Sequence, residues 1–273
     1  MHTLSSDAVR FYTENGYVAP IRAFPAAEAA RFRARLEEFE AQHADQKHIL
    51  RNKTHLVLQW ADELIRHPGV LDAVEQVIGP NILCWSSSFF IKEPHDPSFV
   101  SWHQDSTYWG LEPPEVVTAW VALSESVAAN GAMRVVPGTH KMDQVAHRDT
   151  LAADNLLSRG QEIAVDVDEA QAVALELQPG EMSLHHVRLF HGSEPNPSAR
   201  RRIGFAIRYL PTHVRQVVGM QDSATLVRGV DKYGHFLPER RPEADLAPEA
   251  LALHAQITQQ GEQVLMREIN RPK

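Results

Sequence analysis

Cysteine is nearly absent from this chain, which has Cys84 as its one cysteine among 273 residues. A lone cysteine excludes an internal disulfide and is typical of a reducing compartment, so we expect a cytoplasmic protein. Long apolar runs are absent too, since none approaches the roughly 18 residues that a membrane-spanning helix requires. The first residues lack the apolar centre of a signal peptide, and the sequence therefore predicts neither a membrane anchor nor secretion.

Positive charge is in deficit, because 27 Lys and Arg residues face 35 Asp and Glu residues and give a formal net charge of −8. Proteins bind nucleic acids largely by neutralising phosphates, so this balance disfavours a nucleic-acid partner. Apolar residues at 43% and charged residues at 23% are ordinary for a globular protein, which excludes a disordered chain. Histidine is in excess, with 15 residues that either include metal ligands or are scattered over the surface.

The first 80 residues are predicted to be mainly helical. Pro25 can begin a helix, and four apolar residues then follow at helical spacing, namely Ala29, Phe32, Leu36 and Phe39. A second helical stretch covers about residues 60–78, is interrupted at His67-Pro68 and ends at Gly79-Pro80. A last helix is expected over about residues 248–269.

From residue 81 onward, short apolar and β-branched segments alternate with turn sequences such as Asn130-Gly131 and Pro179-Gly180. The predicted strands cover residues 82–91, 116–123, 134–136, 163–167, 172–177, 181–190 and 202–210. Many short strands together are typical of a β-sandwich or barrel, so we predict an α+β fold with a double-sheet core. A single domain is expected over 1–273, with a helical flank at 1–80, the core at 81–212, and a loop and helix at 213–273.

Three His-x-Asp triplets are candidates for a metal site, namely His43-Ala44-Asp45, His103-Gln104-Asp105 and His147-Arg148-Asp149. His43 ends a helical pattern, in which residues i and i+2 point in different directions and cannot bind one ion. His147 lies in a polar stretch with no further signal. His103 and Asp105 follow a strand-like segment flanked by aromatic residues, and in extended backbone they would share one face and reach one ion. Only this pair is predicted to bind metal.

A third ligand is expected from the segment at 181–191, which contains three histidines. His185 and His191 have the same parity in a strand, whereas His186 faces the other way. His191 precedes Gly192 at the strand end, where the mouth of a barrel would be. Two imidazoles and one carboxylate with open positions are typical of non-haem Fe(II) oxygenases, although zinc accepts the same ligands.

An anion-binding face is predicted downstream of the histidines. By alternation Arg202, Gly204, Ala206 and Arg208 share one side of a strand whose middle is small. Two inward guanidiniums around Gly and Ala would leave space for a small ligand and could hold a carboxylate. Arg200 and Arg201 are expected to be solvated residues of the preceding turn.

These residues together resemble the phytanoyl-CoA dioxygenase (PhyH) family of Fe(II)/2-oxoglutarate-dependent oxygenases. The resemblance covers roughly residues 8–212 and is carried by motifs that occur in order. They are Trp102-His103-Gln104-Asp105-Ser106, the run from Thr118 to Leu123, the run from Asn130 to Lys141, Pro179-Gly180-Glu181, His191-Gly192-Ser193, Asn196, Ser198, Arg202 and Tyr209. The fold implied is a double-stranded β-helix, or cupin-like jelly roll, flanked by N-terminal and C-terminal helices.

The resemblance also implies roles for particular residues. His103, Asp105 and His191 resemble the iron ligands, and Arg202, eleven residues after His191, resembles the partner of the distal carboxylate of 2-oxoglutarate. Ser193 and Trp120 resemble further contacts of this co-substrate; their alternatives are a turn residue and core packing. The cofactors implied are Fe(II), 2-oxoglutarate and O₂.

The activity implied by the resemblance is hydroxylation of a small metabolite, with 2-oxoglutarate converted to succinate and CO₂. Halogenating relatives have a small residue in place of the carboxylate ligand, so the presence of Asp105 favours hydroxylation. Desaturation, epimerisation or cyclisation by the same metal chemistry are alternatives, as is a non-catalytic metal-binding jelly roll.

The substrate is much less defined by the sequence. Lys92 and Arg208, if they point inward, would favour an anionic substrate, whereas Lys92-Glu93 as a surface pair is the alternative. His185, His186 and Tyr108 are further candidates near the barrel mouth. The long polar segment 141–162 is a candidate lid over the site, and no sequence feature indicates the oligomeric state.

Overall fold

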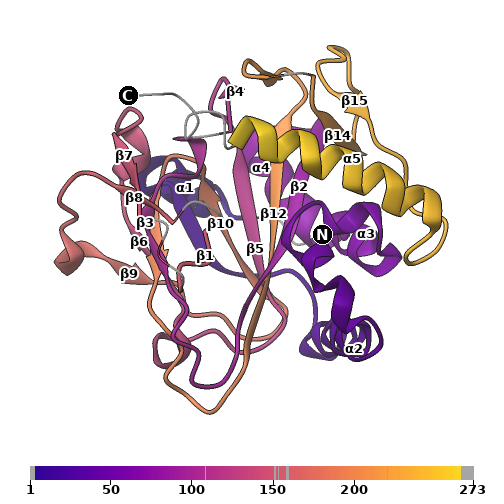
Figure 1. Ribbon diagram of the computed structural model, residues 1–273. Coiled ribbons are helices and arrows are strands. Elements are labelled where there is room, and N and C mark those ends of the chain that lie inside the picture. Colours follow the sequence, from indigo (N-terminus) through magenta and orange to yellow (C-terminus); the bar gives the residue numbers. More distant parts are fainter. Residues whose placement is uncertain are drawn as a thin grey trace.

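Two β-sheets face each other in the computed structural model of the protein, which describes residues 4–107, 109–150, 152, 154–157, 160–219 and 221–265 (Figure 1). In spatial order the larger sheet contains β1 (Tyr17–Arg22), β10 (Glu181–His186), β5 (Val117–Ala122), β12 (Arg202–Pro211), β2 (Ile82–Lys92), β14 (Ser223–Arg228) and β15 (Leu237–Pro238). The smaller sheet contains β3 (Val100–His103), β11 (Phe190–Ser193), β6 (Met133–Val136) and β9 (Val173–Ala174). This is the double-stranded β-helix that the sequence predicts.

Short two-stranded ribbons and helices complete the chain. The ribbons pair β4 (Leu111–Glu112) with β13 (Arg215–Gln216) and β7 (His147–Asp149) with β8 (Gln161–Ile163). The α-helices are α1 (Ser6–Asn15), α2 (Ala26–Gln42), α3 (Gln59–Ile65), α4 (Pro68–Ile78) and α5 (Pro248–Leu265). Short 3₁₀ helices are η1 (Ala44–Arg51), η2 (Thr54–Leu56), η3 (Asp105–Thr107), η4 (Ala128–Asn130), η5 (Thr139–Lys141) and η6 (Glu169–Gln171).

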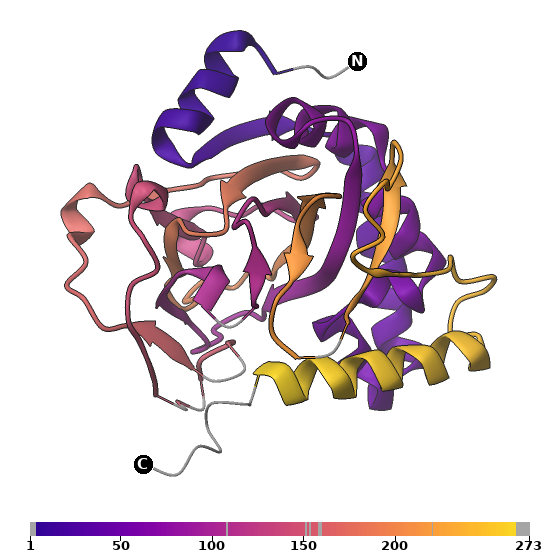
Figure 2. The ribbon, with the colours of Figure 1, turned by 90° about the horizontal axis from the view of Figure 1, so that it is seen from above.

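Helices α2, α3 and α4 lie on the side of the larger sheet that faces away from the smaller sheet (Figures 1 and 2). The apolar residues predicted for α2 are all buried in the core that these helices form with the sheet, namely Ala29, Phe32, Leu36 and Phe39. Helix α4 begins at Pro68 and ends before Gly79, as the sequence predicts. Within the described part of the chain, no helix combines the length and apolar character that crossing a bilayer would require.

The strands of the larger sheet separate two chemical environments. Along β12, Ile203, Phe205 and Ile207 face the helices and join the main core. The alternate residues face the smaller sheet, where Arg202, Ala206 and Arg208 line a pocket. Because successive side chains of a strand point to opposite faces, the alternation read from the sequence places both arginines correctly.

Strand β1 is missing from the sequence-based prediction, which made the first 80 residues mainly helical. Its Tyr-Val-Ala-Pro-Ile-Arg sequence contains Pro20, which reads as a break in a strand. The structure resolves this conflict because β1 is an edge strand that, in the described part of the chain, pairs with β10 alone, and an edge strand tolerates a residue without an N–H.

Two further strand predictions need correction. The segment 181–190, predicted as one strand, is divided between β10 and β11, which belong to opposite sheets and are joined by a turn at 187–189. Residues after 212, predicted as a loop before the last helix, contribute β14 to the larger sheet beside β2. The strands predicted at 163–167 and 172–177 are shorter and shifted, at β8 and β9.

Candidate active site

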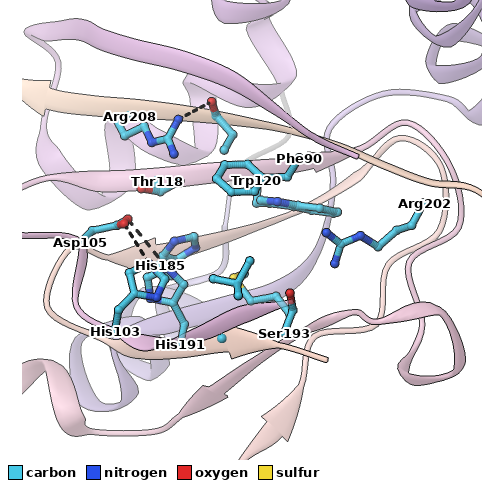
Figure 3. Close-up of a pocket in the computed structure, with 14 residues that line it drawn as sticks. Phe90, His103, Asp105, Thr118, Trp120, His185, His191, Ser193, Arg202 and Arg208 are labelled. Carbon is cyan, nitrogen blue, oxygen red and sulfur yellow. Dashed lines mark hydrogen bonds and ion pairs between the residues drawn. The ribbon is translucent and has the colours of Figure 1, made fainter. Parts of the chain in front are cut away.

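His103, Asp105 and His191 converge at one end of a pocket between the two sheets (Figure 3). His103 and His191 are paired across β3 and β11, with ring centroids 4.0 Å apart. The Asp105 carboxylate lies 3.3 Å from His103 Nε2 and 3.9 Å from His191 Nε2. One ligand atom from each residue lies within 4.8 Å of the others, so the three side chains could bind one ion.

The backbone at Asp105 differs from the prediction. His103 is the last residue of β3, but Asp105 begins the 3₁₀ turn η3 instead of continuing the strand. The turn brings the Asp105 carboxylate close to the His103 imidazole. In extended backbone the side chains of residues i and i+2 would lie farther apart. The predicted pairing of His103 with Asp105 is therefore present, with a different local geometry.

The imidazoles are oriented by backbone carbonyls. His103 Nδ1 is 2.9 Å from the carbonyl oxygen of Ser101, and His191 Nδ1 is 2.9 Å from that of Leu189. Each Nδ1–H can therefore donate to a carbonyl oxygen, which fixes the tautomer. The unprotonated Nε2 of each ring then presents its electron pair to the pocket. Metal-ligating histidines are commonly held in this way.

The protonation states suit a cation. Burial would raise the pKa of Asp105, but the imidazoles of His191 and His103 and the Arg208 guanidinium outweigh it and hold that pKa well below its usual range. Burial lowers the pKa of His191 well below its usual range, assisted by His103. An ionised carboxylate beside a neutral imidazole is the form that binds divalent metal.

Residues 144–147 support the turn that carries Asp105. Gln104 donates its backbone N–H to His147 Nε2 at 3.0 Å, and its side-chain oxygen accepts from Gln144 Nε2 at 2.8 Å and Val145 N at 2.9 Å. His147 is thus not the unremarkable residue of a polar stretch that the sequence indicates. Residues 143–147 of the predicted lid segment 141–162 pack against Gln104, but residues 151, 153, 158 and 159 lie outside the described residues, and the lid stays a prediction.

Arg202 lies at the opposite end of the pocket from the histidines (Figure 3). Its side chain is buried, its Nη1 donates to the carbonyl oxygen of Gly131, and its guanidinium carbon lies 5.3 Å from the centre of the Trp120 ring. Burial lowers the pKa of Arg202 to about 10, which leaves it a cation at neutral pH. Ser193 lines the same end of the pocket.

The space over the small residues of β12 is only partly open, which corrects the sequence-based picture. A Cβ atom on Gly204 would lie 1.8 Å from Cζ2 of Trp120, so the indole ring fills the room that a ligand was expected to use. Trp120 is therefore packed against the strand and also lines the pocket, and its contact with the co-substrate stays a prediction. Ala206, in contrast, lines the pocket directly.

Lys92 is fully buried, so its predicted alternative as a surface partner of Glu93 is wrong. Its ammonium donates to Ser193 Oγ at 2.8 Å and to the carbonyl oxygens of Ser193 and Glu194. Glu93 instead accepts from Arg201, which also pairs with Glu40 at 2.7 Å. Arg201 is thus tied to helix α2 and is not a freely solvated turn residue, whereas Arg200 is exposed.

Arg208 lies above Asp105 and the two histidines in the view of Figure 3. It donates to Ser88 Oγ, and its guanidinium carbon lies 5.6 and 5.9 Å from the centres of the Phe90 and Trp109 rings. Burial lowers its pKa, and the Asp105 charge acts in the opposite direction. The other predicted neighbour, Tyr108, lies outside the described residues.

Several polar atoms in the pocket face no protein partner. Among the described residues, none is present for Thr118 Oγ1, His185 Nδ1 or the Nε atoms of Arg202 and Arg208. Buried polar groups are nearly always hydrogen-bonded, so unpaired atoms around one cavity indicate a ligand. From the sequence Thr118 was named only as the start of a family motif and given no site role, although its position two residues before Trp120 places it on the same face of β5. His186 faces away and lies near His140.

The space between these groups forms one pocket that is partly open to solvent. It measures about 440 Å³, including the open part. A fold of two facing sheets with a two-His, one-carboxylate set and a buried arginine across the pocket is the arrangement of the Fe(II)/2-oxoglutarate oxygenase class.

Comparison with known proteins places the chain within this class. The family model for phytanoyl-CoA dioxygenase (PhyH) matches residues 12–204, and the chain belongs to this family. A probable α-ketoglutarate-dependent hypophosphite dioxygenase from Stutzerimonas stutzeri is 30% identical over 67% of this chain. The human peroxisomal phytanoyl-CoA dioxygenase is 27% identical over 71% of it. The matches span 64% and 65% of these two relatives, just under two thirds of their length.

Solved structures agree over nearly the whole chain. The non-heme monooxygenase ThoJ in its apo form superposes with a TM-score of 0.87 at 36% identity, covering 97% of this chain and all of the other. CytC3 with Fe(II) and α-ketoglutarate superposes with a TM-score of 0.65 at 26% identity, over 89% of this chain and 99% of CytC3. The double-stranded β-helix and the family resemblance are thereby confirmed.

Proposed function

We propose that this protein is an Fe(II)- and 2-oxoglutarate-dependent dioxygenase that hydroxylates a small molecule and converts 2-oxoglutarate to succinate and CO₂. The observation that carries the proposal is that His103, Asp105 and His191 share one pocket with Arg202, a buried cation that no carboxylate among the described residues contacts. Two imidazoles and one carboxylate leave open positions on a six-coordinate ion, and a guanidinium suits a carboxylate.

Each residue has a defined task in this proposal. His103, Asp105 and His191 hold iron through Nε2 and carboxylate oxygens, while Ser101 and Leu189 keep the imidazoles in place. Arg202 and Ser193 bind the distal carboxylate of 2-oxoglutarate, and Trp120 forms the wall beside it. Iron, when bound, supplies the activation of O₂; the chain supplies the binding, the orientation and the enclosed cavity.

The test is spectroscopic and chemical. We expect 2-oxoglutarate, added anaerobically to the Fe(II)-loaded protein, to produce a weak visible charge-transfer band. Admission of O₂ should then release succinate slowly even without substrate. A protein that binds iron but shows neither signal would be a non-catalytic metal-binding jelly roll. Product analysis with a substrate distinguishes hydroxylation from desaturation, epimerisation or cyclisation, and the presence of Asp105 supports hydroxylation.

The substrate is proposed to be a small anion or to carry an anionic group near the oxidised atom. Arg208 lies beside the proposed metal-binding residues with its Nε unpaired among the described residues, and its guanidinium carbon lies 5.6 and 5.9 Å from the centres of the Phe90 and Trp109 rings. Charge-assisted hydrogen bonds to a guanidinium are strong in such surroundings. The name of the Stutzerimonas relative, with hypophosphite as substrate, supports an anion of this size.

Substituting Arg208→Leu should separate substrate recognition from co-substrate binding. We expect substrate-stimulated turnover of hypophosphite, a small phosphonate or a small carboxylate, whichever is active, to fall roughly 10–100-fold, because a charge-assisted hydrogen bond is lost. The charge-transfer titration with 2-oxoglutarate should be unchanged. Arg200→Leu, at an exposed arginine just before the same strand, is the control. An equal loss of 2-oxoglutarate affinity would assign Arg208 to the co-substrate and contradict the prediction.

We also propose that the protein acts in the cytoplasm. Its one cysteine, Cys84, is buried and free, which suits a reducing compartment. The net charge of −8 supports small molecules over nucleic acids as its partners. Fractionation of cells that express the full chain, with detection by an antibody, tests this location.

A further inference from the structure

Lys92 lies directly behind the end of the pocket that contains Arg202 and Ser193. It is the last residue of β2, and the register of the sheet pairs it with Arg202, the first residue of β12. Its side chain is buried, and all its hydrogen-bond acceptors are neutral oxygens of Ser193 and Glu194. A second cation therefore stands next to the proposed carboxylate-binding arginine.

The charges around this pair do not neutralise it by contact. Within the described parts of the chain, no ion pair joins Lys92 or Arg202 to a carboxylate. Asp96 acts on both cations from a distance, but its carboxylate accepts the backbone N–H groups of Glu93 and Ser98 at 3.0 and 2.8 Å. Glu194, the other nearby acid, pairs with Arg134 at 3.3 Å. Two buried cations without a contacting anion are unfavourable, so this end of the pocket is built for a negatively charged group.

The direction of the hydrogen bonds adds a second argument. A lysine ammonium only donates, so the Oγ atom of Ser193 must be the acceptor of the 2.8 Å bond from Lys92. The hydroxyl proton of Ser193 is then available to be donated elsewhere, and Ser193 lines the pocket. A carboxylate there would accept from this hydroxyl as well as from the guanidinium of Arg202.

We infer that Lys92 is a positioning residue for the distal carboxylate of 2-oxoglutarate, acting by holding the Ser193 hydroxyl as a donor and by adding a second positive charge behind it. The inference rests on the proposed function, because it needs 2-oxoglutarate as the ligand. It goes further in assigning co-substrate affinity to a residue that does not line the pocket.

A pH dependence follows from this arrangement. Burial, followed by the nearby Arg202 charge, lowers the pKa of Lys92 to about 7, against the weaker opposite effects of Asp96 and Glu194. A carboxylate bound next to Lys92 favours the protonated form and raises that pKa, so binding takes up a proton. Affinity is therefore complete below pH 7 and falls as the pH rises above it, by at most about tenfold per pH unit.

The decisive experiment compares two 2-oxo acids on the unmodified Fe(II)-loaded protein under anaerobic conditions. Charge-transfer titrations between pH 6.5 and 8.5 should show 2-oxoglutarate affinity falling roughly tenfold. The affinity of 2-oxobutyrate, which chelates metal but has no distal carboxylate, should lack this decrease. Titration of metal-binding histidines affects both acids equally and cancels in the comparison. Calorimetry in two buffers of different ionisation enthalpy should show that the protein takes up a proton when it binds 2-oxoglutarate and takes up none when it binds 2-oxobutyrate.

Two variants provide an independent test of the role of Lys92. Lys92→Met should weaken 2-oxoglutarate binding at least about tenfold at pH 6.5, because a charge-assisted interaction is lost, and should remove its pH dependence. Iron content and 2-oxobutyrate binding should be unchanged. Lys47→Met, at an exposed lysine of η1, is the matched control.

Two results would overturn the inference, namely equal pH profiles for the two acids, or a Lys92→Met protein with the affinity and pH profile of the parent. If the variant does not fold, the comparison of the two acids on the parent protein decides alone. Absence of binding by both acids would instead refute the proposed function.

Discussion

Alanine in place of Asp105 is expected to reduce succinate formation by more than about 100-fold, since even residues that only orient metal ligands commonly contribute 10–100-fold. The carboxylate lies 3.3 Å from His103 Nε2 and 3.9 Å from His191 Nε2, so its removal leaves two imidazoles and no anionic ligand. Iron binding should weaken in parallel, because the remaining site has lost its negative charge. Iron content after gel filtration and succinate released per minute are the two measurements.

The chain contains its own control for this substitution. Asp45 belongs to another His-x-Asp triplet, but it is exposed in η1, next to the end of helix α2. Asp45→Ala should retain the iron content and the turnover of the parent protein. Full turnover in the Asp105→Ala protein, or equal losses in both variants, would contradict the assignment of the metal site.

The sequence predicted which residues meet at the candidate metal site better than it predicted the secondary structure of those residues. The spacing of His103 and Asp105 and the motif around them singled out two of the three side chains that meet in the pocket, although the strand assumed for Asp105 is a 3₁₀ turn. His191 was read as part of the strand that contains His185, yet the two residues belong to β11 and β10 in opposite sheets. Their rings still approach to 4.9 Å, because the two sheets enclose the pocket from both sides.

The buried charges show what a sequence alone cannot specify. Period-two alternation placed Arg202 and Arg208 inward, since alternation is a local property of a strand. Whether Lys92 is buried depends on its pairing with Arg202, a contact between residues 110 positions apart in the chain. The support that His147 gives to Gln104 is likewise set by the packing of one segment on another. The alternation of residues within a strand therefore predicts which face of the sheet a side chain occupies. Which charged side chains come together depends on the register between strands that are far apart in the sequence.

A second buried charge cluster, remote from the pocket, joins three parts of the fold. The Glu239 side chain, 1% exposed, follows β15 and accepts from Lys53 Nζ at 2.7 Å and Thr225 Oγ1 at 2.6 Å. Ser223 Oγ donates to the same carboxylate at 2.7 Å, and His55 lies 3.2 Å from it and contacts Ser87 of β2 at 2.7 Å. The cluster thus ties η2 and β14 to the centre of the larger sheet.

Glu239→Ala is expected to lower the free energy of unfolding by up to about 3–5 kcal/mol, because it removes the nearer carboxylate of the buried Lys53 ammonium and leaves only Asp222, 3.8 Å away. Urea unfolding at pH 7, followed by circular dichroism, measures the loss. Glu243→Ala, at an exposed glutamate four residues further along, should change it by less than about 0.5 kcal/mol.

The pH dependence of the stability lost in Glu239→Ala shows whether the charge or the packing of Glu239 is responsible. Burial alone would raise the pKa of Glu239, but the charge of Lys53 and the hydrogen bond from His55 outweigh it, and the net pKa lies well below its usual value of 4.5. A depressed carboxyl pKa contributes stability that is complete above the unfolded-state pKa and is lost as the pH falls below it. The difference between the parent protein and Glu239→Ala should therefore be constant from pH 8 to about 6 and should shrink as the pH falls below the ordinary glutamate pKa of about 4.3. A difference that stays unchanged at acid pH would attribute the loss to the missing packing of the side chain rather than to its charge.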